Sequence, residues 1–192
     1  ANWTAANLDA PFTARQGHTA ITFDNKIWVF GGAGLGFPND LSWYSSDGIV
    51  WTEVIAAAPF LKRAGHSMTL FDNKLWIIAG GDGDGAKNDI WYSSDGLNWI
   101  EATSAAQFSK RLNHTTVVFD DKLWVIGGRS EFNGIPKNDV WYSSDGMNWM
   151  DATTPTPFPE RWGHTSVVFE NTLWVIAGGD YDAPKNDVWV ID

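Results

Sequence analysis

Hydrophobic and polar residues alternate along this chain in short runs that are separated by turn-forming residues. In the stretch 15–63, Asp24-Asn25 lies between two such runs and Ser46-Asp47-Gly48 lies between two more, and both segments are typical of tight turns between antiparallel strands. The strand-like runs of this stretch are 19–23, 27–30, 41–44 and 50–54. Because no segment has the 3.6-residue periodicity of an amphipathic helix, the pattern predicts an all-β chain.

The same four-strand unit occurs four times, and each copy is introduced by an arginine with a histidine three residues later. Successive copies start 48, 48 and 50 residues apart. A four-stranded unit with bulky residues on both faces is typical of one blade of a β-propeller, since such a blade buries both faces only between neighbours. The sequence therefore predicts a single β-propeller domain of four blades over residues 1–192. The repeats begin at Arg15, Arg63, Arg111 and Arg161.

The two ends of the chain complement each other. The last repeat stops after its third strand, whereas residues 2–6 at the other end match the fourth strands of the earlier repeats at 50–54, 98–102 and 148–152. We therefore expect the N-terminal strand to complete the last blade and to close the ring by backbone hydrogen bonds, which is known as Velcro closure. A closed monomer is the favoured arrangement, and a strand-swapped dimer with a ring of eight blades is the alternative.

Composition and charge narrow the function classes. The chain has 13 Trp and 11 Phe, a load that fits packing between sheets, and it has no cysteine, so thiol chemistry and thiolate metal sites are excluded. A formal net charge of −10 argues against nucleic-acid binding. No apolar run approaches the roughly 20 residues of a membrane span, and no signal peptide is recognisable. We expect no membrane association and no cofactor, and the sequence leaves the compartment open.

Specific residues of the repeats resemble those of the Kelch family. The pattern Arg-x-Gly-His, a strand that ends in Gly-Gly, and then Asn-Asp followed after one or two further residues by Trp resembles the Kelch repeat in all four copies, although the third copy has Asn113 in place of the glycine. In the first copy the last part reads Asn-Asp-x-x-Trp-Tyr. The resemblance implies blades of a β-propeller, and Kelch propellers usually have more blades than four. The resemblance also implies that ligands bind at one opening of the ring, its mouth. In several members of the family, arginines at the position of the repeated arginine hold anionic groups of peptides there.

Two sets of residues are candidates for ligand binding. By the resemblance, the four repeated arginines form a cationic collar at the mouth, although each could instead pair with a repeated acid, Asp40, Asp89, Asp139 or Asp187. The second set lies in the loops after the Gly-Gly pairs, where the four copies differ most. Variable loops on a rigid scaffold often carry recognition. The candidates are Arg15, Arg63, Arg111, Arg161, Phe37, Asp82, Asp84, Arg129, Phe132 and Tyr181.

The four histidines of the chain all occupy one repeated position. Four imidazoles around an axis could in principle hold a divalent metal, but we prefer a role in which each histidine fastens one strand to another. The residues in question are His18, His66, His114 and His164.

The sequence as a whole favours a non-catalytic binding or scaffold propeller that presents one loop face to a protein or peptide ligand, with an acidic ligand suggested by the arginines. Two alternatives are a structural or engineered repeat fragment without a ligand and a carbohydrate-acting enzyme of the Kelch type. Against the enzyme, no Ser-His-Asp set, carboxylate pair or phosphate loop departs from the repeat. The copper radical chemistry of some Kelch relatives requires a Cys-Tyr cross-link, which a chain without cysteine cannot form.

Overall fold

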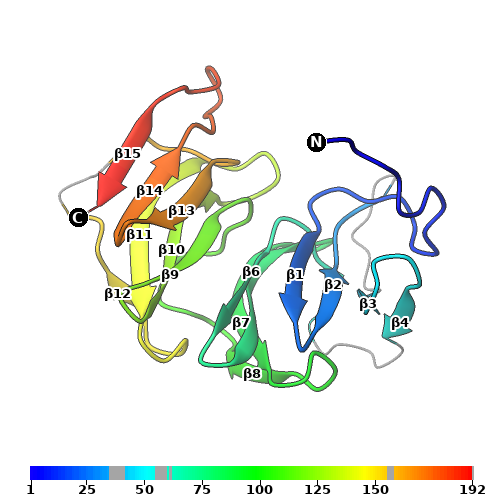
Figure 1. The fold of residues 1–192 in the computed structure, drawn as a ribbon. Helices are drawn as coiled ribbons and strands as arrows, with labels where there is room; N and C mark the ends of the chain where they lie inside the picture. The colour runs from blue at the N-terminus through cyan, green and yellow to red at the C-terminus, as the bar shows by residue number, and fades with distance from the viewer. Residues whose placement is uncertain (35–41, 55–59, 61, 155–157, 192) are drawn as a thin grey trace.

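The computed structural model of the chain describes residues 1–34, 42–54, 60, 62–154 and 158–191. In this part of the chain every regular element is a β-strand, and the strands form four antiparallel sheets in chain order (Figure 1). These sheets are the blades of a β-propeller, which confirms the predicted all-β fold.

Each of the first three blades has four strands that pair in sequential order. Blade 1 contains β1 (Thr19–Phe23), β2 (Lys26–Phe30), β3 (Ser42–Ser45) and β4 (Thr52–Val54). Blade 2 contains β5 (Ser67–Phe71), β6 (Lys74–Asp82), β7 (Gly85–Ser93) and β8 (Ile100–Thr103). Blade 3 contains β9 (Thr115–Phe119), β10 (Lys122–Arg129), β11 (Pro136–Ser143) and β12 (Met150–Asp151). Blade 4 has three strands, β13 (Thr165–Phe169), β14 (Thr172–Ile176) and β15 (Val188–Ile191).

The turns between the strands are built from the residues that the sequence indicated. Asp24 and Asn25 both adopt positive φ, 49° and 55°, as a two-residue hairpin turn of the primed type requires. In the second turn of blade 1, the carboxylate of Asp47 accepts hydrogen bonds from the backbone amides of Ile49 and Val50 at 2.8 Å. These local bonds bend the chain back on itself and bring β3 and β4 side by side.

The core of the molecule lies between blades rather than within one of them. Trp28 and Phe30 on blade 1 pack against Leu75 and Ile77 on blade 2. The same kind of apolar layer fills the junctions between blades 2 and 3 and between blades 3 and 4. Each blade therefore uses one face toward the preceding blade, its rear face, and one toward the following blade, its forward face.

Polar bonds fasten the same three junctions at their inner ends. The backbone N–H of a glycine on one blade donates to the carbonyl of the arginine on the next, at 2.9 Å in each case. One such glycine, Gly80, has φ +94°, and a Cβ added there would come within 2.6 Å of the Cβ of His66. Only glycine fits this position, which explains why a glycine recurs there in every blade. The bonded pairs are Gly32 with Arg63, Gly80 with Arg111, and Gly128 with Arg161.

The predicted closure of the ring by the N-terminal strand is wrong for this structure. Residues 2–6 lie in no strand, Trp3 is 99% exposed, and the last sheet contains only β13, β14 and β15. Figure 1 shows the blue N-terminal segment apart from the red β15. The reason lies in the junctions, because recurring side chains and hydrogen bonds set a similar rotation from each blade to the next. Four blades joined with that rotation do not bring blade 4 back to blade 1.

Candidate functional site

Three of the four repeated arginines are buried and paired with the repeated acids. Arg63 donates to both carboxylate oxygens of Asp89 at 3.0 and 2.8 Å, and to the carbonyl of Ala79 at 2.9 Å. Arg111 and Arg161 form the same two-pronged contact with the acids of their own blades, and their side chains are 0% exposed. The pairs are Arg63 with Asp89, Arg111 with Asp139, and Arg161 with Asp187.

The fourth arginine lies at the start of blade 1. Arg15 is less buried than its equivalents and donates from Nη1 to the carbonyl of Gly31 at 2.9 Å. Its expected acid, Asp40, and the candidate aromatic Phe37 lie outside the described residues. In blades 2, 3 and 4, an anionic ligand at the arginines would have to displace a carboxylate that already holds both terminal nitrogens.

Electrostatics at these pairs favours the ionised acid. Burial tends to raise the pKa of Asp89, but the hydrogen bonds and charge of Arg63, together with a hydrogen bond from Trp91, outweigh it and lower the pKa. Asp139 is held in the same way by Arg111 and Trp141. Each pair therefore remains charged, and its geometry joins the inner end of a blade to its third strand.

The histidines fasten neighbouring blades. Nε2 of His66 lies 2.8 Å from Oγ1 of Thr19 on the preceding blade. His114 and His164 make the equivalent contacts to Ser67 and Thr115 at 2.8 and 2.9 Å. Burial and the nearby Arg63 lower the pKa of His66 to about 3, and burial with the nearby Arg161 lowers that of His164 to about 4. In the described ranges, no group of three or more His, Cys, Asp and Glu side chains is placed to hold a metal ion.

The loops at the arginine end differ from blade to blade in their charge. In blade 2, Asp82 forms an ion pair with Lys87 at 3.0 Å, and its Oδ1 accepts the backbone N–H of Asp84 at 2.9 Å. In blade 4, Asp180 forms the equivalent ion pair with Lys185 at 2.5 Å. In blade 2 an aspartate at the end of the second strand thus neutralises a lysine of the third strand, and in blade 4 the equivalent aspartate and lysine lie between these two strands.

Blade 3 breaks this arrangement. Ser130 occupies the position of Asp82 and Asp180, so Lys137 has no ion-pair partner among the residues that the structure describes. Burial and the positive charge of Arg111 lower the pKa of Lys137, and Asp139 and Glu160 act against that shift. Ser130 has therefore removed the negative charge that pairs with the equivalent lysine in blades 2 and 4.

A second replacement in blade 3 adds a positive charge. Arg129 occupies the position of a glycine in blades 2 and 4, and its guanidinium lies over the indole ring of Trp162, 4.2 Å from the centroid. Nε of Arg129 is buried without a hydrogen-bond partner in the described part of the chain. Blade 3 therefore carries Arg129 and Lys137 where its neighbours carry a glycine and a neutralised lysine.

Three large apolar side chains are exposed on the loops of blades 3 and 4. Phe132, Ile135 and Tyr181 are 43%, 68% and 59% exposed. The loops that carry them are joined across blades, since a carboxylate oxygen of Glu131 accepts the backbone N–H of Ala86 at 3.1 Å and the hydroxyl of Tyr181 donates to the carbonyl of Gly134. The loop ends of blades 2, 3 and 4 thus form one connected surface, which we call the loop face.

Shallow hollows lie on the loop face. One of about 390 Å³ is lined by Trp162, Tyr181 and the turn that follows Asp180. A second, of about 250 Å³, is lined by Arg63, Lys87 and Lys110 together with acidic residues of blade 2. Both hollows are open to solvent and mix apolar with charged groups, which suits a peptide side chain better than a buried small molecule.

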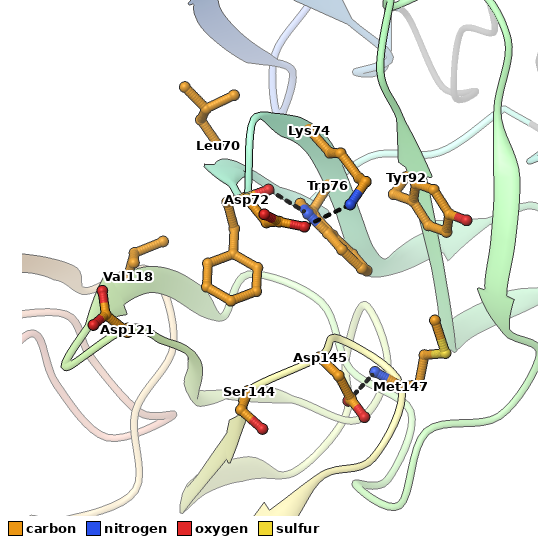
Figure 2. A pocket seen from close by; sticks show the side chains of 11 residues that line it. Leu70, Asp72, Lys74, Trp76, Tyr92, Val118, Asp121, Ser144, Asp145 and Met147 are labelled. Atoms are coloured by element: carbon orange, nitrogen blue, oxygen red, sulfur yellow. Dashed lines mark hydrogen bonds and ion pairs between the residues drawn. The ribbon is translucent and has the colours of Figure 1, made fainter.

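A larger hollow than these two lies at the opposite end of the blades, and Figure 2 shows it from close by. It has a volume of about 640 Å³, and in its lining Lys74 contacts Asp72 at 2.6 Å beside Trp76 and Tyr92. A hollow of about 450 Å³ with the equivalent Asp120, Lys122, Trp124 and Tyr142 occurs at the next junction. Because it recurs with the repeat, this hollow is a feature of blade packing.

Some of the predicted site residues lie together on the loop face, and others are buried below it. Arg129, Phe132 and Tyr181 lie on the loop face together with Asp82 and Asp84, whereas Arg63, Arg111 and Arg161 are buried beneath it in their own ion pairs. Sequence reasoning missed Lys137, Ile135 and Trp162. The available signal was the replacement of Gly-Asp by Arg129-Ser130 in one blade only, which leaves the lysine of that blade without its acid.

The comparisons with known proteins agree with the geometry. The model of the KLHDC2/KLHL20/DRC7 Kelch-repeats domain matches residues 1–149, which is most of the chain. A search of curated proteins gave no match. Among the described residues, no helix is long and apolar enough to cross a membrane.

Proposed function

The chain belongs to the Kelch-repeat family, and from this premise we propose that it is a non-catalytic binding module that holds a protein or peptide ligand on the loop face. The observation that carries the proposal is the departure of blade 3 from its neighbours. The fold requires the residues that all blades share, whereas Arg129 occurs in blade 3 alone, and Lys137 has no ion-pair partner among the described residues.

The chemistry of the loop face favours a ligand that combines an acidic group with an apolar one. A carboxylate placed between Arg129 and Lys137 would gain charge-assisted hydrogen bonds, and it would offset the repulsion between Lys137 and Arg111. The exposed Phe132, Ile135 and Tyr181 would cover an apolar side chain next to that carboxylate. Asp82 and Asp84 lie at the blade 2 edge, and their charge would disfavour a ligand that is acidic along its whole length.

A phage-displayed library of random peptides, selected on the immobilised protein, tests this function. We expect the selected peptides to be enriched in Asp or Glu next to an aromatic or aliphatic residue. Titration calorimetry with one such peptide should then show that Lys137→Ala and Arg129→Ala each weaken binding about tenfold or more, as loss of a charged contact predicts.

Two further variants sharpen the test. Ser130→Asp restores the acid found in blades 2 and 4. The new carboxylate should pair with Lys137 and weaken binding of the peptide to a similar extent. Lys185→Ala is the matched control, because this lysine is already neutralised by Asp180. Thermal unfolding of each variant establishes that it is folded. Selected peptides that bind the Lys137, Arg129 and Ser130 variants as tightly as the original protein would refute the proposal.

A further inference from the structure

The forward face of blade 4 is apolar, and no blade lies against it in the part of the chain that the structure describes. Its members are the equivalents of residues that are buried or half-buried at the other three junctions: Ile176 is 37% exposed, whereas Phe30, Ile78 and Ile126 are at most 1% exposed. Val188 is 54% exposed, whereas its counterparts Ile90 and Val140 are 0% exposed. This face consists of Val167, Phe169, Trp174, Ile176, Val188 and Val190.

The rear face of blade 1 is uncovered in the same way. Ile27 is 37% exposed, although the leucines at the equivalent position of the other blades, Leu75, Leu123 and Leu173, are 0% exposed. His18 is exposed as well, while the other three histidines are buried against a preceding blade. The molecule thus ends in two apolar faces, and each is one half of a junction that the chain forms three times internally.

The polar groups of these two faces match each other. At the internal junctions a hydroxyl at the start of the first strand meets the histidine of the next blade, as in the contact of Thr19 with His66 at 2.8 Å. At the open ends the corresponding groups are Thr165 and His18, and both are exposed. A fourth junction of the same kind would bring them together.

The shapes of the two faces match as well. Trp28 of blade 1 packs onto the turn glycine of blade 2, where a Cβ on Gly96 would lie 2.6 Å from Cη2 of the indole. Trp76 covers Gly146 of blade 3 in the same manner. For blade 4 the corresponding pair is Trp174 and Gly48, and the nearest atom to a Cβ on Gly48 is the side chain of Ile27 at 3.6 Å. The space that a tryptophan fills elsewhere is open at Gly48.

The N-terminal segment supplies the strand that blade 4 lacks. In each of the first three blades a phenylalanine before the first strand makes an edge-to-face contact with the tryptophan before the fourth strand, as Phe60 does with Trp99 at 4.8 Å between centroids. Phe158 is the corresponding phenylalanine of blade 4, and Trp3 is the corresponding tryptophan. Trp3 is 99% exposed and does not reach Phe158 within the chain.

We propose that these faces bind a second copy of the chain. The forward face of blade 4 of each copy packs on the rear face of blade 1 of the other, and residues 2–6 of each copy add to β15 of the other as its fourth strand. Two copies related by a twofold axis then form two identical junctions and a ring of eight blades, which lies within the range that propellers adopt. A second copy is the partner that fits, because both halves of the missing junction occur in this chain. The apolar side chains, the polar groups and the shapes of the two halves match each other.

Light scattering combined with sedimentation velocity on the 192-residue chain tests the proposal. The expected mass is twice the 21.3 kDa of one chain. A mass of one chain at all concentrations would overturn the proposal, and so would open-ended assembly that grows with concentration, because a closed pair leaves no free face.

Substitutions with matched controls locate the contact. Trp3→Ala should raise the dissociation constant of the dimer about tenfold or more, since Trp3 fills the place beside Phe158. Leu8→Ala is the control, because Leu8 lies in the same segment and is 93% exposed. Val188→Glu should also dissociate the dimer, and Ile100→Glu, which alters an outer strand at a residue with 55% exposure, should not. Equal effects of variants and controls would show that copies associate through another surface.

Discussion

Blade 2 lies between two neighbours and blade 4 has only one, and the two blades differ in burial far more than in sequence. Ile78 and Ile176 are the same residue at the same position of the repeat, and yet one is 0% and the other 37% exposed. The apolar side chains of a blade form a core only when the next blade covers them. Stability in this fold therefore depends on junctions, as nearest-neighbour models of repeat proteins assume.

The comparison also separates two kinds of residue. Arginine–aspartate pairs hold each blade together internally, and they are present in blade 4 as in blades 2 and 3. Apolar and histidine contacts hold blades to each other, and they are missing on the open side of blade 4. Substitutions at equivalent positions of an inner blade and an end blade can therefore measure separately how much the contacts within a blade and the contacts between blades contribute to stability.

The largest effect is expected from an arginine of an inner blade. Arg111→Ala leaves the partly buried carboxylate of Asp139 without its partner, and we expect a loss of about 3–5 kcal/mol in the free energy of unfolding. Arg161→Ala should cost less, because Asp187 is 33% exposed and can regain water. Urea denaturation followed by tryptophan fluorescence measures both values. A cost for Arg111→Ala below about 1 kcal/mol would mean that the pair is not a stabilising element.

The second prediction compares a residue at a junction between blades with the equivalent residue on the open forward face of blade 4. Ile78→Ala removes a fully buried side chain and should cost about 2–5 kcal/mol, whereas Ile176→Ala should cost about 1 kcal/mol or less in a chain whose blade 4 is uncovered. The measurement belongs in a Trp3→Ala background, where association of two copies is weakened. Equal costs in that background would contradict the open forward face of blade 4.

Much of this architecture could be predicted from the sequence. Strand positions, turns such as Asp24-Asn25 and the blade repeat follow from local patterns, because turn chemistry and strand alternation depend on neighbouring residues. The closure of the ring could not be predicted, since the match between residues 2–6 and the other fourth strands does not say whether four blades rotate far enough to meet. That rotation depends on how side chains such as Trp28 and Phe30 pack between blades.

The candidate site was predictable only in part. The divergent loops with Phe132 and Tyr181 stood out because they break the repeat. The sequence does not contain the distances between strands. It therefore shows neither the contact of Arg111 with Asp139 nor the lack of an ion-pair partner for Lys137 among the described residues. Comparing blades position by position, with attention to lost ion-pair partners, would have identified Lys137.

The smallest expected effect concerns pH and again compares junctions with the open end. The pKa of His66 is lowered to about 3 in the folded chain, so the unfolded chain binds a proton near its ordinary pKa of about 6.5 while the folded chain does not. The stability that His66 provides is therefore complete above about pH 6.5, and it falls by about 1.4 kcal/mol per pH unit as the pH decreases toward 3. Protonation in the folded state would place a charge on a buried ring whose Nδ1 has no hydrogen-bond partner among the described residues. His66→Gln should flatten the decline in urea stability between pH 6.5 and 5 by about 2 kcal/mol. His18→Gln should flatten the decline less, because His18 is exposed and only partial desolvation and the nearby Arg15 lower its pKa. Because His18 becomes buried only if another blade covers it, an equally large flattening by His18→Gln in the Trp3→Ala monomer would show that the rear face of blade 1 is already covered within a single chain.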